Sequence, residues 1–354
     1  MEKTLLNYLK THGKTPESYI LSKFKAHDIV LLGEMHYIKQ ELEILHRLIP
    51  LLPAAGIHYI VYEFARREDQ PLVDRLLTNP HFDVNLAKRI MIQQESIWGY
   101  HEYLEVFRII WQLNQALPTA KQIRLIGLND PYNWKLYREI CETQKREPNP
   151  QERSKIWAGC SEEYWADTVG DIYRPGTKIL GYMGSLHGIT KYREANLKEE
   201  NAHLVFQGFE TKRFGNYLYE RYGDQVFNIC FYDFWDSVEI PTKMQAPAGG
   251  IIEKAISPHY QEIAFDLINS PFGDLPDDSS FSLGYPDFRL QDHYDGMIYV
   301  GKLADFKPLS PISDFIDADN IEIFRDFNAY NADADLSIEQ INEMIRKYAD
   351  LNEE

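Results

Sequence analysis

Carboxylate and imidazole side chains recur where apolar runs of this sequence end, and this placement could support chemistry. The set comprises three carboxylates and two imidazoles, which in chain order are Glu34, His36, Glu63, Asp130 and His187. An imidazole held beside a carboxylate can act as a general base on a water molecule. Two imidazoles with a carboxylate could instead hold a divalent metal, with His36 and His187 as the possible metal ligands. Either chemistry requires that these side chains meet in the fold.

Short apolar runs predict the strands that would bring these side chains together. We expect strands at 29–32, 57–62, 123–127, 178–183, 226–232 and 296–300, with a further candidate at 263–268. The first run lacks polar alternation, which is typical of a parallel strand buried on both faces. An amphipathic helix predicted at 39–52 joins the first two strands into a βαβ unit. Because open α/β sheets place ligands at the carboxyl ends of their strands, we expect the set to converge at that edge.

The predicted fold is therefore α/β, with a central, mostly parallel sheet and flanking helices. The polar and mostly helical segment from about 132 to 175 is expected to be a helical insertion. A C-terminal helical extension is expected from about 304 to 354, where Ser337 and Gln340 have the spacing of a capping box. No internal repeat or low-complexity linker interrupts the chain, so we expect a single domain over residues 1–354.

Each candidate residue also has an ordinary structural explanation. A single carboxylate after a strand is commonly a helix cap or an ion-pair partner, and a single histidine is commonly a structural residue. The same placement at four strand ends favours a joint site. Gly33 and Gly184 support this interpretation, because glycine at a strand end permits close approach of another group. An ordinary turn is the alternative for both glycines.

Other residues could bind substrate beside this set. Arg66 and Arg67 follow Glu63, and one of them could bind a carboxylate or orient Glu63. The alternative is a solvated helix start. Trp98 and His101 flank the start of a long predicted helix and could line the pocket, with a place in the core or on the surface as the alternative. The substrate-binding candidates are Arg67, Trp98 and His101.

Several other patterns point less clearly to a site. His293 and Asp295 precede the last predicted strand, so they belong to its N-terminal end, which is usually the structural side of a sheet. Asn331, Asp333 and Asp335 faintly resemble a calcium loop, but the glycine and the glutamate that such a loop requires are missing. The sequence contains no GxGxxG, P-loop or GxSxG motif.

Composition limits the classes of partner and compartment. The chain has 354 residues, is 44% hydrophobic and carries a formal net charge of -17, so we expect no nucleic-acid partner. The three cysteines have no paired spacing that predicts a disulfide framework or a CxxC motif. No apolar run has the length of a signal peptide core or a membrane span. We therefore expect a cytoplasmic protein that does not bind membranes.

The strand-end motifs, taken in order, resemble the erythromycin esterase-like and ChaN-like superfamily, to which TraB/Tiki proteins are more distantly related. The matching features are Leu-Gly-Glu-Met-His at 32–36, a strand ending in Glu63, Trp98 ahead of a helix, and the segments 126–130, 181–188 and 294–299. The resemblance covers roughly residues 20–305. It implies an α/β fold with helical insertions, and it implies that Glu34, His36, Glu63 and His187 line the active site.

The branches of this superfamily imply different activities. In the esterase branch a histidine activates water to cleave an ester or lactone, in the Tiki branch the equivalent groups hold a divalent metal, and the ChaN branch binds haem. This chain departs from the esterases in its short segment at 184–188 and its long acidic region after Asp233, so the resemblance does not extend to a macrolide substrate.

The leading hypothesis is a hydrolase that acts on a small-molecule ester, lactone or related carbonyl compound. His36 would be the general base, Glu34 or Glu63 would orient it, and His187 would polarise the carbonyl or protonate the leaving group. A divalent metal held by His36, His187 and a carboxylate is a variant of the same site. A haem or small-ligand carrier without catalysis is the alternative, and a non-catalytic interaction module is a third. The sequence indicates neither the substrate nor the oligomeric state.

Overall fold

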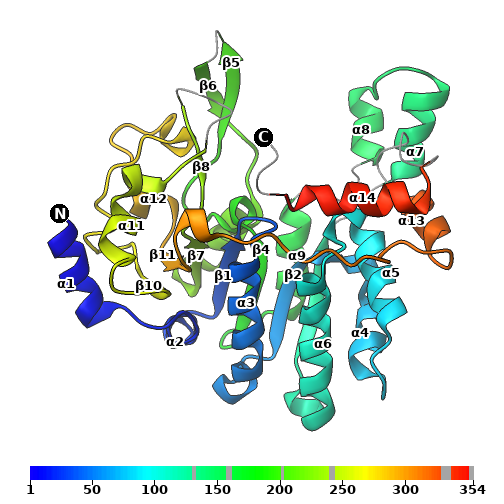
Figure 1. Cartoon of the computed structure of the whole chain (residues 1–354), viewed down its shortest axis with the longest axis horizontal. Helices are drawn as coiled ribbons and strands as arrows, with labels where there is room; N and C mark the ends of the chain where they lie inside the picture. Colours follow the sequence, from blue (N-terminus) through cyan, green and yellow to red (C-terminus); the bar gives the residue numbers. More distant parts are fainter. Residues whose placement is uncertain (130–132, 157–161, 201–202, 239–243, 328–335, 351–354) are drawn as a thin grey trace. The chain divides into compact units, whose positions relative to one another are not determined.

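A seven-stranded sheet in the order β10-β11-β7-β1-β4-β2-β3 forms the centre of the fold (Figure 1). The computed structural model describes the chain except residues 130–132, 157–161, 201–202, 239–243, 328–335 and 351–354. The strands of the sheet are β1 Ile29–Glu34, β2 Tyr59–Arg66, β3 Arg124–Asn129, β4 Ile179–Gly184, β7 Val226–Phe231, β10 Ile263–Asp266 and β11 Gly296–Tyr299. The predicted α/β fold with a mostly parallel sheet is confirmed, since only β10, at one edge, is found antiparallel to its neighbour among the described pairings.

Fourteen α-helices and two small hairpins are found with this sheet among the described residues. The helices are α1 Glu2–His12, α2 Pro16–Lys23, α3 Lys39–Leu48, α4 Gln70–Thr78, α5 Val84–Gln94, α6 His101–Ala116, α7 Trp134–Arg138, α8 Pro150–Ile156, α9 Glu162–Ile172, α10 Phe214–Tyr222, α11 Ile251–Ile256, α12 Leu290–His293, α13 Ile321–Phe327 and α14 Ile338–Tyr348. The hairpins pair β5 Ala195–Glu200 with β6 His203–Phe209, and β8 Trp235–Asp236 with β9 Met244–Gln245.

The chain forms two compact units, each built from two separate segments. The first unit comprises Met1–His36 and Pro175–Phe306, and the second comprises Tyr37–Arg174 and Lys307–Glu354. Strands β10, β11, β7, β1 and β4 belong to the first unit, and β2 and β3 belong to the second. The organisation as a single domain stays a prediction.

In the first unit, apolar strands place the reactive side chains at one end of the sheet. Residues Ile29–Leu32 of β1 are completely buried, as the unbroken apolar run predicts. Strand β1 pairs in parallel with β4 on one side and β7 on the other, so the carboxyl ends of the three strands lie at one edge. At the opposite end Asp28 has a structural role, because it accepts hydrogen bonds from Lys178 Nζ at 2.8 Å and from the Gly176 amide at 2.9 Å.

In the second unit, two predicted elements have different limits from those expected. The helix predicted at 39–52 ends as α3 at Leu48 and continues only as short 3-10 turns, because Pro50 has no N–H to donate to the preceding helical turn. The strand predicted at 57–62 runs on to Arg66 as β2. Between Tyr62 and Arg66 it bulges, since these residues pair with Gly127 and Asn129. Glu63 therefore lies inside a β-bulge rather than after a strand.

No helix in the described part of the chain is both long and apolar enough to cross a lipid bilayer. Of the three cysteines, Cys141 and Cys230 form no disulfide within the described residues, and Cys160 lies outside them.

Candidate active site

Glu34 and His36 form a hydrogen-bonded pair at the end of β1. His36 Nδ1 lies 2.8 Å from Glu34 Oε1. The Glu34 side chain is buried, whereas one third of the His36 side chain is exposed. Since an ionised carboxylate can only accept a hydrogen bond, it fixes the proton of a neutral His36 on Nδ1 and leaves Nε2 as a hydrogen-bond acceptor. The pair therefore has the chemistry of an oriented general base.

Tyr182 completes the surroundings of Glu34. Its hydroxyl donates a hydrogen bond to Glu34 Oε2, so both carboxylate oxygens have a partner. The register of the two strands explains this contact. Gly184 of β4 lies opposite Glu34, and Tyr182 precedes Gly184 by two residues, so its side chain projects from the same face of the sheet as Glu34. The Tyr182 hydroxyl was not identified among the candidate residues, because a single sequence does not specify the register between β1 and β4.

Gly184 accommodates both histidines of the first unit. A Cβ added at Gly184 would lie 2.9 Å from His36 Nε2 and 3.4 Å from His187 Cδ2. The two imidazoles therefore approach the same point on β4 and are no farther apart than the sum of these distances. A side chain at this position would displace the His36 ring. The structure thus brings Glu34, His36 and His187 together.

Hydrogen bonds from β7 and from the residue after α12 hold the turn that carries His187. This residue lies on a 3-10 turn, Ser185–Gly188, directly after β4. The Tyr294 hydroxyl donates to the Ser185 carbonyl at 2.5 Å, and Asn228 Nδ2 donates to the Gly188 carbonyl at 3.2 Å. Both ends of the turn are therefore fixed, which limits the positions that the His187 ring can adopt.

The remaining predicted catalytic residues lie elsewhere in the chain. Glu63 belongs to the second unit, where its side chain is buried within the bulge of β2. Asp130 follows β3 but falls outside the described residues. Their catalytic roles stay predictions.

The predicted substrate-binding residues all belong to the second unit. Arg67 Nη2 donates to Asp171 Oδ2 at 2.8 Å, and its guanidinium lies over the Tyr164 ring. Trp98 is buried and packs edge-on against Phe64, with ring centroids 4.8 Å apart. His101 is exposed at the start of α6. These contacts describe where the three residues lie, and their binding roles stay predictions.

Arg66, the alternative to Arg67, is engaged within its own segment. Its guanidinium donates two hydrogen bonds to the Asp69 carboxylate, at 2.8 and 3.1 Å, and the Arg66 side chain is buried. Gln93 donates to the same carboxylate at 3.1 Å. This network supports the start of α4.

A small pocket of about 170 Å³ is lined in part by residues that adjoin the two histidines in the sequence, namely Met35, Ser185 and Leu186. The rest of its lining consists of residues at and after the end of β7, of Met244 and Phe281, and of His293 and Tyr294 in and after the short helix α12. His293 is part of this lining. The sequence assigns His293 to the N-terminal end of the last strand, but α12 brings it to residues that follow β1, β4 and β7.

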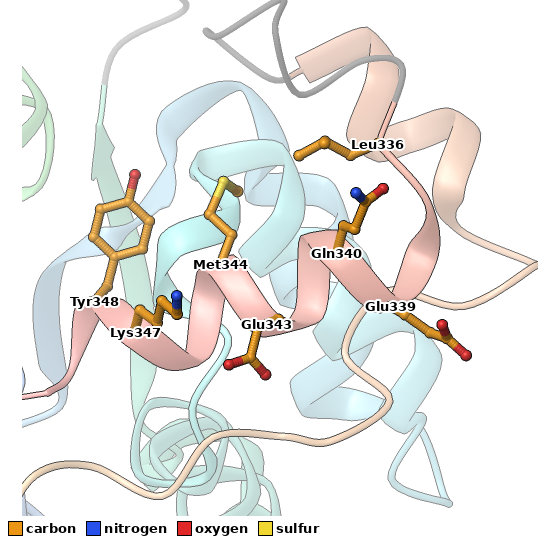
Figure 2. Close-up of a pocket in the computed structure, with 7 residues that line it drawn as sticks. All are labelled: Leu336, Glu339, Gln340, Glu343, Met344, Lys347 and Tyr348. Atoms are coloured by element: carbon orange, nitrogen blue, oxygen red, sulfur yellow. The ribbon is translucent and has the colours of Figure 1, made fainter.

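A larger pocket of about 730 Å³ lies on the surface of α14 (Figure 2). Its lining consists of Leu336, Glu339, Gln340, Glu343, Met344, Lys347 and Tyr348. Figure 2 shows six of these side chains along α14 and Leu336 on the segment before it, and the carboxylates of Glu339 and Glu343 point away from Met344. Because it contains no imidazole and shares no residue with the Glu34–His36 pair, this groove is not a site for the expected chemistry.

The described residues contain no group of three or more His, Cys, Asp or Glu side chains that could hold a metal ion. The metal variant of the site therefore stays a prediction that a measurement of bound metal has to test.

Comparisons with protein-family models and with the sequences of curated proteins give no match. Solved structures do resemble the chain. A protein from Bacillus cereus aligns with a TM-score of 0.53 at 14% identity, over 88% of this chain and 99% of its own. A succinoglycan biosynthesis protein aligns with a TM-score of 0.54 at 10% identity, over 88% and 98%.

A mutant of the erythromycin esterase EreC in its open conformation aligns with a TM-score of 0.52 at 11% identity, over 80% of this chain and 93% of its own. The predicted erythromycin esterase-like fold is thereby confirmed. At such low identities the likeness concerns the fold alone.

Proposed function

We propose that the protein is a hydrolase that cleaves an ester, lactone or related carbonyl compound with water activated by His36. The observation that carries this proposal is the contact between His36 Nδ1 and the buried Glu34 carboxylate, which directs Nε2 away from the carboxylate. A base oriented by a carboxylate is the arrangement that general-base catalysis requires. The fold shared with an erythromycin esterase is consistent with this chemistry, although a fold does not determine a reaction.

The proposed reaction uses these groups in the following order. His36 Nε2 takes a proton from water while the water oxygen bonds to the carbonyl carbon, and Glu34 stabilises the imidazolium that forms. The bond from this carbon to the leaving oxygen then breaks, and that oxygen receives a proton from an imidazolium. His187, which approaches Gly184 together with His36, is the second group that can polarise the carbonyl or supply this proton. The products are a carboxylic acid and an alcohol.

The test is hydrolysis of a panel of esters and lactones by wild type and by His36→Ala. We expect His36→Ala to lower kcat by about 10²- to 10⁴-fold, the usual contribution of a general base. The matched control is His27→Ala, which removes a histidine close to the other end of β1 whose Nδ1 contacts the Asp224 carbonyl at 2.6 Å. Glu63→Gln tests the predicted role of Glu63 in the same assay. Full turnover in His36→Ala would overturn the proposal.

The alternative of a haem or small-ligand carrier stays a prediction. It is tested separately, because haem bound by the purified protein produces a Soret band whether or not any ester is cleaved.

A further inference from the structure

The small pocket of the first unit contains a buried histidine that the proposed mechanism does not use. His293 lines this pocket and is 3% exposed. Neither of its ring nitrogens has a hydrogen-bond partner among the described residues. Buried polar groups in folded proteins are nearly always hydrogen-bonded, so an exception points to a function or to a ligand.

Aromatic side chains surround the His293 ring and hold it in place. The ring centroid of Phe281 lies 4.2 Å away, that of Tyr192 lies 4.5 Å away and that of Trp235 lies 5.3 Å away. These rings provide no acceptor or donor for the imidazole nitrogens within the described contacts. The imidazole is thus rigidly held, and both of its nitrogens are buried without a hydrogen-bond partner among the described residues.

The pocket lining contains two buried titratable groups, His293 and Asp233, and one exposed carboxylate, Asp236. Burial lowers the pKa of His293 to about 3, so its ring is neutral. Burial also raises the pKa of Asp233, a second lining residue, well above its usual range, which favours the protonated carboxyl. An anion that reached these two buried groups would lose its hydration without meeting a lysine or arginine among the described lining residues. A neutral imidazole and a protonated carboxyl instead offer two donors and an acceptor to an uncharged polar group.

The volume and walls of the pocket suit a small ring. A cavity of about 150 Å³ lined by apolar side chains is known to hold benzene, and this pocket encloses about 170 Å³. Its apolar lining is provided by Met35, Leu186, Phe234, Trp235, Met244 and Phe281. The occupant that fits is therefore a ring-sized molecule or substituent with one hydrogen-bonding group.

We propose that this pocket binds an uncharged, ring-sized part of the substrate that carries a hydroxyl or carbonyl group hydrogen-bonded to His293. As a statement about substrate, this assignment rests on the proposed function. Met35 lies between Glu34 and His36 in the sequence, and Ser185 and Leu186 precede His187, so a group in the pocket is bound beside the segments that carry both histidines.

Three probes with the same ring and different charge test the pocket: benzyl alcohol, benzoate and benzylammonium. Binding to the full chain at pH 7 is measured by ligand-observed NMR and calorimetry. We expect benzyl alcohol to bind at least about tenfold more tightly than either ion, because desolvation penalises the charged probes. Equal affinity for benzoate or benzylammonium, or no detectable binding of benzyl alcohol, would overturn the proposal.

Two variants locate the probe. His293→Phe keeps an aromatic ring but removes both nitrogens, and we expect it to weaken benzyl alcohol binding by about tenfold, the effect of roughly one hydrogen bond. Met244→Trp fills the pocket from the short strand β9 without changing His293, and it should also prevent binding. Unchanged affinity in both variants would contradict the assignment.

The His36→Ala variant separates this proposal from the proposed function. His36 does not line the pocket, so we expect His36→Ala to bind benzyl alcohol as wild type does. Retained binding in this variant, together with lost turnover, supports both proposals. Retained binding with full turnover overturns the hydrolase mechanism but leaves the binding site in place.

Discussion

At the scale of single residues, the buried Glu34 carboxylate is the group on which the orientation of His36 depends. It accepts a hydrogen bond from Tyr182 and lies 2.8 Å from His36 Nδ1. Residue type and spacing were sufficient to predict that Glu34, His36 and His187 would meet, because all three follow strands of one parallel sheet. Tyr182 could not be recognised in the same way, because its role depends on the register between β1 and β4, which a single sequence does not specify.

We predict that Tyr182→Phe lowers the free energy of unfolding by about 2 kcal/mol, because a hydrogen bond to a charged acceptor contributes about 1.5–3 kcal/mol. Urea unfolding measures this change. The matched control is Tyr217→Phe in α10, because the structure shows no hydrogen bond from the Tyr217 hydroxyl to any described residue. Equal losses of stability in the two variants would contradict the role assigned to Tyr182.

At the scale of elements, the junction between β4 and the turn Ser185–Gly188 determines where the two histidines can lie. Gly33 at the end of β1 contributes to the same junction, since a Cβ there would come within 2.7 Å of Ser185 Cα. Such close backbone approach requires the absence of a side chain. Close packing at this junction therefore explains why glycine occupies both positions, Gly33 and Gly184.

We predict that Gly184→Ala abolishes most of the hydrolytic activity while the protein stays folded. The new Cβ would lie 2.8 Å from His36 Cε1, so the ring has to move away from its position beside Glu34. Gly188→Ala on the same turn is the matched control, because its nearest neighbour, Met183 Sδ, would be at an ordinary distance of 3.8 Å. Turnover and circular dichroism of both variants check the prediction. Equal activity in the two variants would refute it.

Elements that sequence patterns missed have identifiable physical causes. The β5–β6 hairpin was not predicted, and a register shift between Asn196 and Leu197 interrupts its regular pairing. The irregular pairing of β2 after Tyr62 was not foreseen, because Glu63 and Ala65 are residue types that are uncommon in strands and the predicted strand ended at residue 62. His293 precedes β11, as the sequence indicates, but its place on the short helix α12 beside residues that follow β1 and β4 could not be foreseen.

At the scale of the whole molecule, the fold resembles an esterase and at least one other type of protein, so the fold leaves the reaction open.

The stability of the whole chain depends on pH when buried groups change their pKa on folding. His293 is neutral in the folded protein, since burial lowers its pKa to about 3, whereas a histidine in the unfolded chain takes up a proton near pH 6.5. Its contribution to stability is thus present above pH 6.5 and is lost as the pH falls toward 3.

We predict that His293→Phe unfolds with a weaker dependence on pH than wild type does below pH 6.5. The difference in slope should approach about 1.4 kcal/mol per pH unit, the value for one proton. Asp233→Asn should remove a pH dependence of the opposite sign, in which stability falls as the pH rises. The raised pKa of Asp233 means that its stabilising contribution is lost as the pH rises, so the amide should make the protein more stable than wild type at pH 7.

Urea unfolding of wild type, His293→Phe and Asp233→Asn at several pH values between 5 and 7.5 measures both effects. Parallel stability curves for wild type and His293→Phe would show that the imidazole is not held neutral by burial. A less stable Asp233→Asn at pH 7 would show that the carboxylate form is the one the fold favours.

The tautomer of His36 tests most directly whether Glu34 orients this histidine as a general base, because the measurement needs no knowledge of the substrate. Nitrogen-15 NMR of the histidine rings distinguishes a proton on Nδ1 from one on Nε2, and His36→Ala identifies the signal. We expect neutral His36 to carry its proton on Nδ1 in wild type, and Glu34→Gln to abolish this preference. A proton on Nε2 in wild type, or an unchanged tautomer in Glu34→Gln, would contradict this expectation.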